Sequence, residues 1–365
     1  MNYDEEIKSF LKKRNIKHDK NMINIIKNIS SLDTSICKDI KKNKKDKLCI
    51  AYAQEPILCL SKGKDKIIKS HVVPENQISK FIEAYGEIRS FSFSIFNKIN
   101  DFPNHSSTSS PDFIGFCESC EKSFTQAHKI NIDSEVNFKK EHLLKSLYRY
   151  MGKEITYRES YLKHALFIIN DDDKFINKDD FEYFNINVNG YNNNDYIVSQ
   201  THYLRTLKNL FFDLGIYSSL PQHSIPKNTS DVFSFDKIKI SNKYQIIGQS
   251  LGLIPLYYKD YNAYFPVFFN IVYDDKNKCS YFYFLTRSDI LIQIKKIVSQ
   301  LTINQKELFY IILAIFNSSE IYFTDSFLNN HYPLIEKIIS NIKMKNLGFF
   351  DEIKELSNNI KNTLK

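Results

Sequence analysis

The chain has 365 residues, of which 42% are hydrophobic, 14% aromatic and 25% charged. This apolar content can offset the entropy of ordering the chain, so wholesale disorder is excluded, and the length predicts two or three domains. The nine glycines form neither GxGxxG nor the P-loop pattern, so the sequence does not support a dinucleotide site or a P-loop phosphate site.

Lysine and arginine outnumber aspartate and glutamate by 50 to 42, which gives a formal net charge of +8. This excess permits a polyanionic partner but does not require one. Met1 is followed by acidic residues at positions 4–6 rather than by a basic segment and an apolar stretch, and the apolar run at 309–316 is too short to cross a bilayer. We therefore expect a soluble, cytoplasmic protein with no membrane partner.

Residues 1–47 form the first predicted unit, a group of N-terminal helices. Met and Ile recur at helical spacing from Met22 to Ile29. The basic run at 41–45 is typical of a solvated linker. A nucleic-acid contact is the alternative, although no aromatic residue is interleaved with these lysines.

Residues 48–159 form the second predicted unit, in which cysteine, serine and glycine separate shorter elements. Strand-like and helix-like spacings alternate within it. In chain order we expect a strand at 66–73, a helix at 78–85, a strand at 87–96 and an unpatterned loop at 97–111. Two helices follow, one that begins near Cys117 and one at 139–157.

Residues 160–365 form the third predicted unit. An acidic triplet at 171–173 and an asparagine-rich stretch at 185–195 indicate turns and a boundary. Strands and helices then alternate, which predicts an α+β or an α/β domain. The fold class that we expect is thus α+β, with a zinc-binding N-terminal domain and a second α/β domain. The expected strands are 264–273 and 280–286, and the expected helices are 291–300, 305–316 and 334–345.

Four of the six cysteines crowd one part of the chain. In a chain without a signal peptide, cysteines are better interpreted as thiols or metal ligands than as disulfides. Cys117 and Cys120 form C-x-x-C, a spacing that lets two thiolates on a first helical turn bind one tetrahedral Zn²⁺. With Cys49 and Cys59 upstream, we predict a structural zinc site. The alternative is that these four are unligated core cysteines, which is what we expect of the two isolated cysteines, Cys37 and Cys279.

The segment KSHVVP at 69–74 is predicted to leave a hairpin strand and enter a helix. Together with the later C-x-x-C at a helix start, it resembles the HNH (ββα-metal) nucleases, which are built on a treble-clef zinc scaffold. The segment 107–120 and the helix at 144–154 also resemble an uncharacterised bacterial family with a C…C…SHxxP…GFCxxH/C pattern. The resemblance covers about residues 48–158 and, more weakly, 320–327.

The resemblance implies catalytic roles for His71 and Glu121. His71 would be the general base that activates water, since a neutral imidazole near its ordinary pKa accepts a proton at cellular pH. A divalent cation, Mg²⁺ or Mn²⁺, would polarise the scissile phosphate, with Glu121 as an oxygen ligand. The chain departs from the family pattern at Ser70, where a carboxylate or histidine usually stands. It also departs on the helix, where Glu121 or, two turns on, His128 replaces the usual Asn or His.

The sequence leaves two other interpretations of His71 open. His71 can be the fourth zinc ligand beside Cys59, Cys117 and Cys120, which would leave Cys49 in the core. It can also be an ordinary hairpin residue.

A competing motif, GQSLG at 248–252, matches the nucleophile elbow of serine hydrolases. An elbow must pass directly into a helix, whereas Pro255 interrupts the first turns and 253–258 predicts a strand. We therefore expect Ser250 in a turn between strands. As a nucleophile it would need a histidine partner from this half of the chain, and the candidates are His202, His223 and His331.

The resemblance thus implies a metal-dependent nuclease of HNH type that acts on nucleic acid, with DNA favoured, in bacterial defence. The alternative is a non-enzymatic protein with a structural zinc site that binds nucleic acid or a protein partner. Ser70 favours the alternative, whereas His71 and Glu121 favour the enzyme. A serine hydrolase built on Ser250 is a remote third class.

Overall fold

The computed structural model describes residues 8, 20–42, 48–71, 73–90, 104–105, 112–128, 140–170, 175–189, 192–219, 232–258, 261–316, 320–342 and 349–365. Its helical elements are α2 Lys20–Lys42, α3 Ile50–Gln54, the 3-10 helix η1 Pro56–Leu58, α4 Glu75–Tyr85, α5 Glu118–His128, α6 Lys140–Ile169, α7 Lys178–Phe184, the π-helix η3 Asn185–Asn189, α8 Asn193–Ser219, α10 Ser288–Val298, α11 Ile303–Phe316, α12 Asp325–Asn341 and α13 Phe349–Thr363. Its strands are β1 Ile67–His71, β2 Ile88–Ser90, β3 Asn104–His105, β4 Asp112–Cys117, β5 Phe233–Ile240, β6 Ile246–Tyr258, β7 Tyr261–Asp274, β8 Cys279–Arg287 and β9 Ile321–Thr324.

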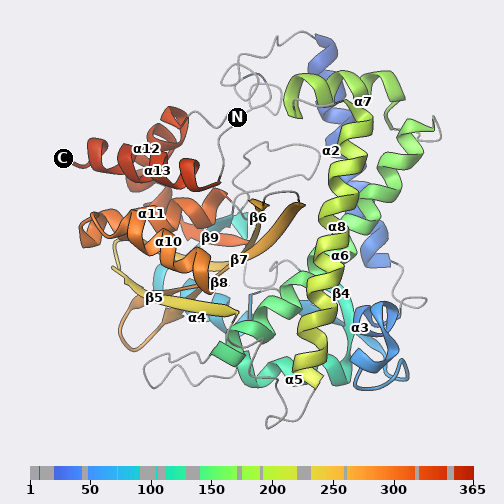
Figure 1. Cartoon of the computed structure of the whole chain (residues 1–365), viewed down its shortest axis with the longest axis horizontal. Helices are drawn as coiled ribbons and strands as arrows, with labels where there is room; N and C mark the ends of the chain where they lie inside the picture. The colour runs from blue at the N-terminus through green and yellow to red at the C-terminus, as the bar shows by residue number, and fades with distance from the viewer. Residues whose placement is uncertain are drawn as a thin grey trace.

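A seven-stranded sheet in the order β3-β2-β9-β6-β7-β8-β5 lies at the centre of the molecule (Figure 1). Its neighbouring strands all pair antiparallel. Only residues 259–260 and 275–278 link β6, β7 and β8, and such short links cannot hold a crossover helix. Of the α+β and α/β classes that we expected for residues 160–365, the α/β class is therefore excluded. This part is α+β, because hairpins rather than β-α-β units connect its long strands.

Helices α10 to α13, which we call the helical layer, cover one face of this sheet (Figure 1). Side chains alternate between the two faces along a strand, so Phe282 and Phe284 of β8 point into this layer. The ring of Phe284 stacks on Phe269 at 5.1 Å and lies 5.8 Å from the ring of Tyr310 on α11. The helices predicted at 291–300 and 305–316 correspond to α10 and α11. The helix predicted at 334–345 corresponds to α12, which begins earlier, while 343–348 lie outside the described residues.

The opposite face of the sheet packs against α6 and α8. The alternate residues of β8, such as Tyr283 and Leu285, share one apolar core with Leu147 and Met151 of α6. Helix α4 packs at one end of the sheet against β2, β6, β7 and β9, where Phe81 packs edge-on against Tyr273 of β7 at 5.4 Å. The sheet is thus enclosed between the helical layer and a second layer made of α6 and α8.

Helix α6 runs well past the helix predicted at 139–157 and connects two cores. Its first half belongs to the core under the sheet, whereas Tyr161, Ala165 and Ile168 pack against α2, α7 and α8. The turn predicted from the asparagines after 185 is wrong at 185–189, where a π-helix forms. Asn185 is fully buried there and donates to the side chain of Asn193 at 2.8 Å, so these amides satisfy each other inside the protein.

The predicted units share elements of the fold. Strand β2, from the second predicted unit, pairs with β9 from the third. Likewise, the core beneath the sheet combines residues of α6 and β4 with residues of β7 and β8. Which of the ranges 1–47, 48–159 and 160–365 folds independently stays a prediction.

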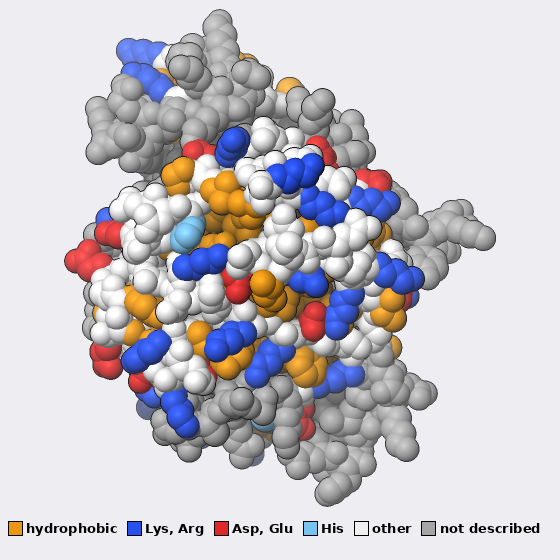
Figure 2. Space-filling view, turned by 90° about the vertical axis from the view of Figure 1, so that its left-hand side faces the viewer, with side chains coloured by type: hydrophobic (Ala, Val, Ile, Leu, Met, Phe, Trp, Pro, Cys, Tyr) orange, Lys and Arg blue, Asp and Glu red, His pale blue; other side chains and the backbone are white. Residues whose placement is uncertain are grey.

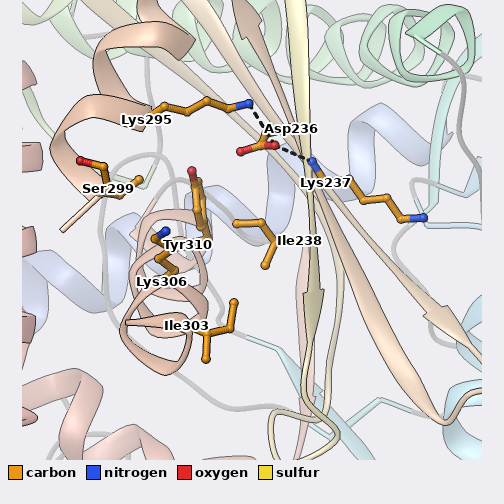
Figure 3. A pocket seen from close by; sticks show the side chains of 9 residues that line it. Asp236, Lys237, Ile238, Lys295, Ser299, Ile303, Lys306 and Tyr310 are labelled. Atoms are coloured by element: carbon orange, nitrogen blue, oxygen red, sulfur yellow. Dashed lines mark hydrogen bonds and ion pairs between the residues drawn. The ribbon is translucent and has the colours of Figure 1, made fainter. Parts of the chain in front are cut away.

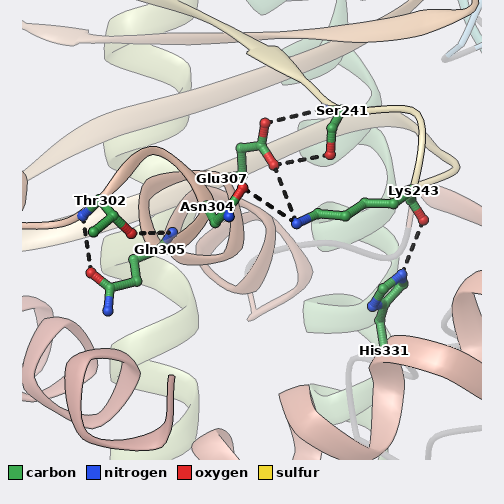
Figure 4. Close-up of polar contacts among 7 residues, drawn as sticks. All are labelled: Ser241, Lys243, Thr302, Asn304, Gln305, Glu307 and His331. Carbon is green, nitrogen blue, oxygen red and sulfur yellow. Dashed lines mark hydrogen bonds and ion pairs between the residues drawn. The ribbon is translucent and has the colours of Figure 1, made fainter. Parts of the chain in front are cut away.

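Glu307 of α11 fixes the turn between β5 and β6 (Figure 4). Its buried carboxylate accepts hydrogen bonds from the backbone N–H and the hydroxyl of Ser241, each at 3.1 Å. Lys243 lies 4.0 Å from the same carboxylate, and its carbonyl contacts Nε2 of His331 at 3.0 Å. Burial lowers the pKa of this histidine. The helical layer is therefore joined to the sheet by polar contacts as well as by apolar packing.

Candidate metal centre

Four short segments bring four cysteines together at one end of the molecule, where α3, β4 and α5 lie close to one another (Figure 1). Cys49 directly precedes α3 and Cys59 directly follows η1. Cys117 is the last residue of β4, and Cys120 lies in the first turn of α5. We call residues 48–71 and 112–128, which hold these segments and strand β1, the cysteine corner.

The four sulfur atoms all lie within 4.8 Å of one another. Sγ of Cys49 is 3.8 Å from Sγ of Cys120, and Sγ of Cys59 is 3.8 Å from Cys117 and 3.9 Å from Cys120. Four ligands at the usual Zn–S distance of about 2.3 Å, placed at the corners of a tetrahedron, stand about 3.8 Å apart. The donor set and its spacing therefore fit a tetrahedral metal ion such as Zn²⁺.

Hydrogen bonds from neighbouring residues converge on these sulfurs. The backbone N–H of Leu60 donates to Cys120 and that of Cys117 donates to Cys49, each at 3.4 Å. The hydroxyl of Ser61 donates to Cys117 at 3.3 Å. Donors directed at sulfur stabilise thiolates, which are the form that binds metal, so the surroundings of the cluster suit a metal-binding role.

The four thiols are buried, and Cys49, Cys117 and Cys120 affect one another's ionisation. Hydrogen bonding with the Cys120 thiol lowers the pKa of Cys49 to about 5. The same contact raises the pKa of Cys120, and burial raises that of Cys117. Negative charge on one sulfur thus opposes charge on its neighbours. A divalent cation would remove this conflict by neutralising the thiolates.

Aromatic rings and a glycine close the inner side of the cluster. Phe116, next to Cys117, lies 5.1 Å from the ring of Phe124 and 5.9 Å from that of Tyr148. A Cβ atom at Gly152 of α6 would stand 2.5 Å from the Phe116 ring, so only glycine lets α6 approach so closely. The cluster is therefore shielded from solvent by α6 as well as by its own segments.

The structure brings together Cys49, Cys59, Cys117 and Cys120, the four residues that we predicted as metal ligands. That they bind a metal stays a prediction. The buried Cys279 lies at the start of β8 and is outside this cluster, as its isolation in the sequence indicated.

Of the two predicted catalytic residues, His71 lies between Cys59 and Cys117 in the chain, and Glu121 directly follows Cys120. His71 is the last residue of β1, and its register partner on β4 is Asp112. The side chains of His71 and Asp112 lie outside the described part of the chain. Glu121 lies on α5, where Oε1 of its largely buried carboxylate accepts a hydrogen bond from Nε of Arg149 at 2.6 Å. The catalytic roles of His71 and Glu121 stay predictions.

Several residues around the cluster were not singled out by the sequence analysis. Asp112 becomes apparent only from the pairing of β1 with β4. Ser61 follows Cys59 by two residues. A serine so close to a predicted metal ligand could have indicated a hydroxyl that donates to a cysteine sulfur. Arg149 and Lys153 interrupt the apolar face of α6, and charged residues on an inward face indicate buried partners.

One such partner lies on the sheet. Nζ of Lys153 donates to Oε1 of Glu320, and both side chains are more than nine-tenths buried. The hydroxyl of Tyr322 donates to the other carboxylate oxygen at 3.0 Å, and Lys153 lies 5.2 Å from the ring centre of Tyr150. The ion pair therefore connects α6, which covers the cluster, to the residue just before β9.

The nucleophile-elbow motif has a different structure from an elbow and from the turn that we expected. Ser250 lies inside β6, which continues through Pro255, so no helix follows it. Its hydroxyl is buried and has no hydrogen-bond partner among the described residues. Gly248 has a φ of 147° and lets the carbonyl of Glu320 approach to within 2.1 Å of where a Cβ would be. The glycine therefore serves strand packing rather than an elbow. His223 lies outside the described residues.

A separate cavity of about 350 Å³ lies between β5, α10 and α11 (Figure 3). Lys295 reaches Asp236 at 3.2 Å, and the ammonium of Lys237 points away, 4.3 Å from the ring centre of Tyr281. Burial, with Asp236 nearby, raises the pKa of Tyr310. Figure 2 shows lysine and arginine side chains mixed with apolar ones on the face that carries the helical layer. Because two of its lysines are already engaged, the cavity offers little free charge, and it shares no residue with the cysteine corner.

Comparison of the chain with models of protein families, with curated proteins and with solved structures finds no match. Among the described helices, none combines the length and the apolar character needed to span a bilayer. What can be said of function therefore rests on the residues and geometry of the chain itself.

Proposed function

We propose that this protein is a metal-dependent nuclease of HNH type whose cysteine corner is a treble-clef zinc scaffold. The observation that carries the proposal is the order of elements around the four sulfurs. A cysteine-bearing loop leads into β1, β1 pairs with β4, and β4 leads directly into α5 with Cys117 and Cys120 at the junction. This strand, strand and helix arrangement is what the resemblance to ββα-metal nucleases requires.

In this proposal His71 is the general base. It takes a proton from a water molecule whose oxygen attacks the phosphorus of a phosphodiester, and the bond to the leaving oxygen breaks. A bound Mg²⁺ or Mn²⁺ would stabilise the charge that develops on the phosphate and on the leaving oxygen. Glu121 is the carboxylate that we assign to this cation, as the resemblance implies. The Zn²⁺ held by the four cysteines is structural. We place the activity in the cytoplasm and in bacterial defence, with DNA as the favoured substrate.

The test is cleavage of plasmid DNA by the purified protein with Mg²⁺ or Mn²⁺, beside measurement of its zinc content. A general base contributes about 10²- to 10⁴-fold to rate, so His71→Ala should lower cleavage by at least about 100-fold. Zinc content and melting temperature should not change. His202→Ala, an exposed histidine on α8, is the matched control and should cleave normally.

Two results would contradict the proposal. If the His71→Ala protein loses zinc together with activity, His71 is a metal ligand and the general-base role is wrong. If the wild-type protein with a full complement of zinc cleaves neither DNA nor RNA with either cation, the protein is not a nuclease.

One observation favours the alternative of a non-enzymatic, zinc-stabilised protein that binds nucleic acid or a protein partner. Arg149 already holds the carboxylate of Glu121, which reduces the capacity of Glu121 to ligate a second cation. The variant Glu121→Gln distinguishes the two functions. In the nuclease this variant should weaken activation by Mg²⁺, whereas in a binding protein no cleavage exists to be weakened.

A further inference from the structure

The turn between Cys59 and β1 carries lysines that the metal-site assignment does not use. Lys62, Lys64 and Lys66 are all exposed, and no carboxylate of the described residues pairs with them. The acidic residue among them, Asp65, faces the other way and accepts from the backbone N–H of Ser119 at 3.2 Å. The three lysine ammonium groups are therefore exposed to solvent, whereas the carboxylate of Asp65 contacts the positively polarised N-terminus of α5.

This turn is held in one conformation by its backbone. The N–H of Lys62 donates to the carbonyl of Cys59 at 3.0 Å, and the N–H of Lys64 donates to that of Ser61 at 3.1 Å. Lys62 and Gly63, at the tip, have φ values of 52° and 78°, as in the tight turns that favour glycine. Because the backbone of the turn is already ordered, less backbone entropy is lost when the turn binds a partner.

The turn is also fixed to the four-cysteine cluster, through the bonds from Leu60 to Cys120 and from Ser61 to Cys117. Large apolar side chains of the same corner are exposed. Ile57 is 73% exposed, Leu48 57% and Leu60 53%. Exposed apolar groups beside unpaired lysines fit a partner that has both anionic groups and apolar surfaces.

The position of the lysines relative to His71 decides among partners. Lys66 leads directly into β1, and His71 ends that strand. From Ile67 to His71 the strand extends about 13 Å at about 3.3 Å per residue. This is close to the major-groove width of about 12 Å, so the spacing along β1 between Lys66 and the backbone of His71 matches one groove of a duplex.

We propose that the lysine turn, residues 57–66, is the surface that binds the nucleic-acid backbone. Lys62, Lys64 and Lys66 contact phosphates, and Ile57 lies against sugars or base edges. This inference rests on the proposed function for its choice of partner. It deepens that function by assigning substrate binding to the turn that the cysteine cluster orders.

The experiment measures binding of labelled duplex DNA to the full chain at several salt concentrations, without added Mg²⁺ or Mn²⁺, so that no cleavage occurs. The variant Lys62→Ala/Lys64→Ala/Lys66→Ala should bind more weakly. Its slope of log affinity against log salt should be flatter by about 2.7, which is three times about 0.9 for each lost phosphate contact. Ile57→Ser should weaken binding severalfold without changing the slope, because it removes no charge.

The matched control is Lys178→Ala/Lys276→Ala/Lys296→Ala, which removes three exposed lysines from other parts of the molecule. It should keep the wild-type affinity and slope. Zinc content and melting temperature of the turn variant should match the wild type, because its three side chains make no buried contact. Equal binding by the turn variant and the control would overturn the inference.

Failure of the inference and failure of the nuclease proposal give different results. If the wild type binds DNA through the turn but never cleaves it, the inference holds and the nuclease proposal fails. If the turn variant cleaves and binds normally, the inference fails and the nuclease proposal holds. Binding to vesicles of anionic phospholipid that depends on the turn, without binding to duplex DNA, would overturn the inference in favour of a membrane surface.

Discussion

The helical layer and the cysteine corner are built on different sources of stability. In the helical layer, helices of 11 to 17 residues cover strands of up to 14 residues. Their shared core consists of aliphatic and aromatic side chains, with Phe309 and Ile312 among those that are fully buried. In the cysteine corner, a helix of five residues, a 3-10 helix of three, a two-stranded sheet and the 11-residue helix α5 surround four thiols.

This difference teaches which part of the molecule depends on a bound ion. A long amphipathic helix buries enough apolar surface to hold its place on a sheet. A two-stranded sheet is marginal in water by itself. A metal ion compensates for such a deficit, because its binding free energy becomes folding free energy. We therefore expect the corner to depend on metal and the helical layer to tolerate its removal.

Of the variants that we consider, Cys117→Ser should change the relative stability of the two regions most. It removes a ligand from a site of a kind whose apparent zinc-binding free energy is about 10–16 kcal/mol. We expect the protein to lose its zinc, and amide hydrogen exchange should accelerate in β1, β4 and α5. Amides of α11 should stay protected. The measurements are metal analysis and hydrogen exchange followed by mass spectrometry.

Cys279→Ser is the control for this variant, because Cys279 is also buried but lies outside the cluster. It should retain full zinc content. Uniform loss of protection in both regions of the Cys117→Ser protein would break the comparison, since the corner and the helical layer would then unfold as one unit.

The next largest effect should come from the buried ion pair between Lys153 of α6 and Glu320, which lies just before β9. Replacing Lys153 by Met leaves the carboxylate of Glu320 buried without its cation, which costs about 3–5 kcal/mol. The free energy of unfolding should fall by this amount in urea denaturation, while zinc content stays unchanged because no ligand is touched.

Adding Glu320→Leu to Lys153→Met sharpens this prediction. A matched apolar pair avoids a buried charge, so the double variant should recover most of the lost stability. If the double variant is as unstable as the single one, then packing of the lysine stem rather than the charge pair explains the loss.

The proximity of the four cysteines could be predicted from the sequence because the signal is local. Cys117 and Cys120 are three positions apart, and a C-x-x-C at a helix start places both sulfurs on one side. We assigned Cys49 and Cys59 to the same ligand set because they lie upstream in the same part of the chain. The sequence could not tell whether Cys49 or His71 completed the set, since that depends on how β1 pairs with β4.

The arrangement of the sheet could not be predicted, because it depends on contacts between distant residues. The strands β7 and β8 were expected from their alternating aromatic residues, but no local pattern indicates that β2 pairs with β9. Gly248 shows the same difficulty. The GQSLG sequence predicts a turn, yet the close approach of the Glu320 carbonyl gives the glycine its role within a continuous strand.

The smallest expected effect concerns the contact between α6 and the cysteine corner. In Gly152→Ala the new Cβ would lie 2.5 Å from Cζ and 2.7 Å from Cε2 of Phe116. The ring cannot shift freely, because Phe124 and Tyr148 pack against it. Overpacking costs about 1–3 kcal/mol, and the better helix propensity of alanine returns about 1 kcal/mol of this. We therefore expect a net loss of about 0–2 kcal/mol and weaker zinc retention against a chelator, since Phe116 precedes Cys117.

Phe116→Leu supplies the matched test of that contact. Leucine lacks the ring edge that meets the new Cβ, so Gly152→Ala should cost less in the Phe116→Leu background than in the wild type. Urea denaturation and chelator titration of the four proteins measure this coupling. If alanine costs the same in both backgrounds, the Gly152 contact does not couple α6 to the metal centre, and the cysteine corner depends on its metal alone.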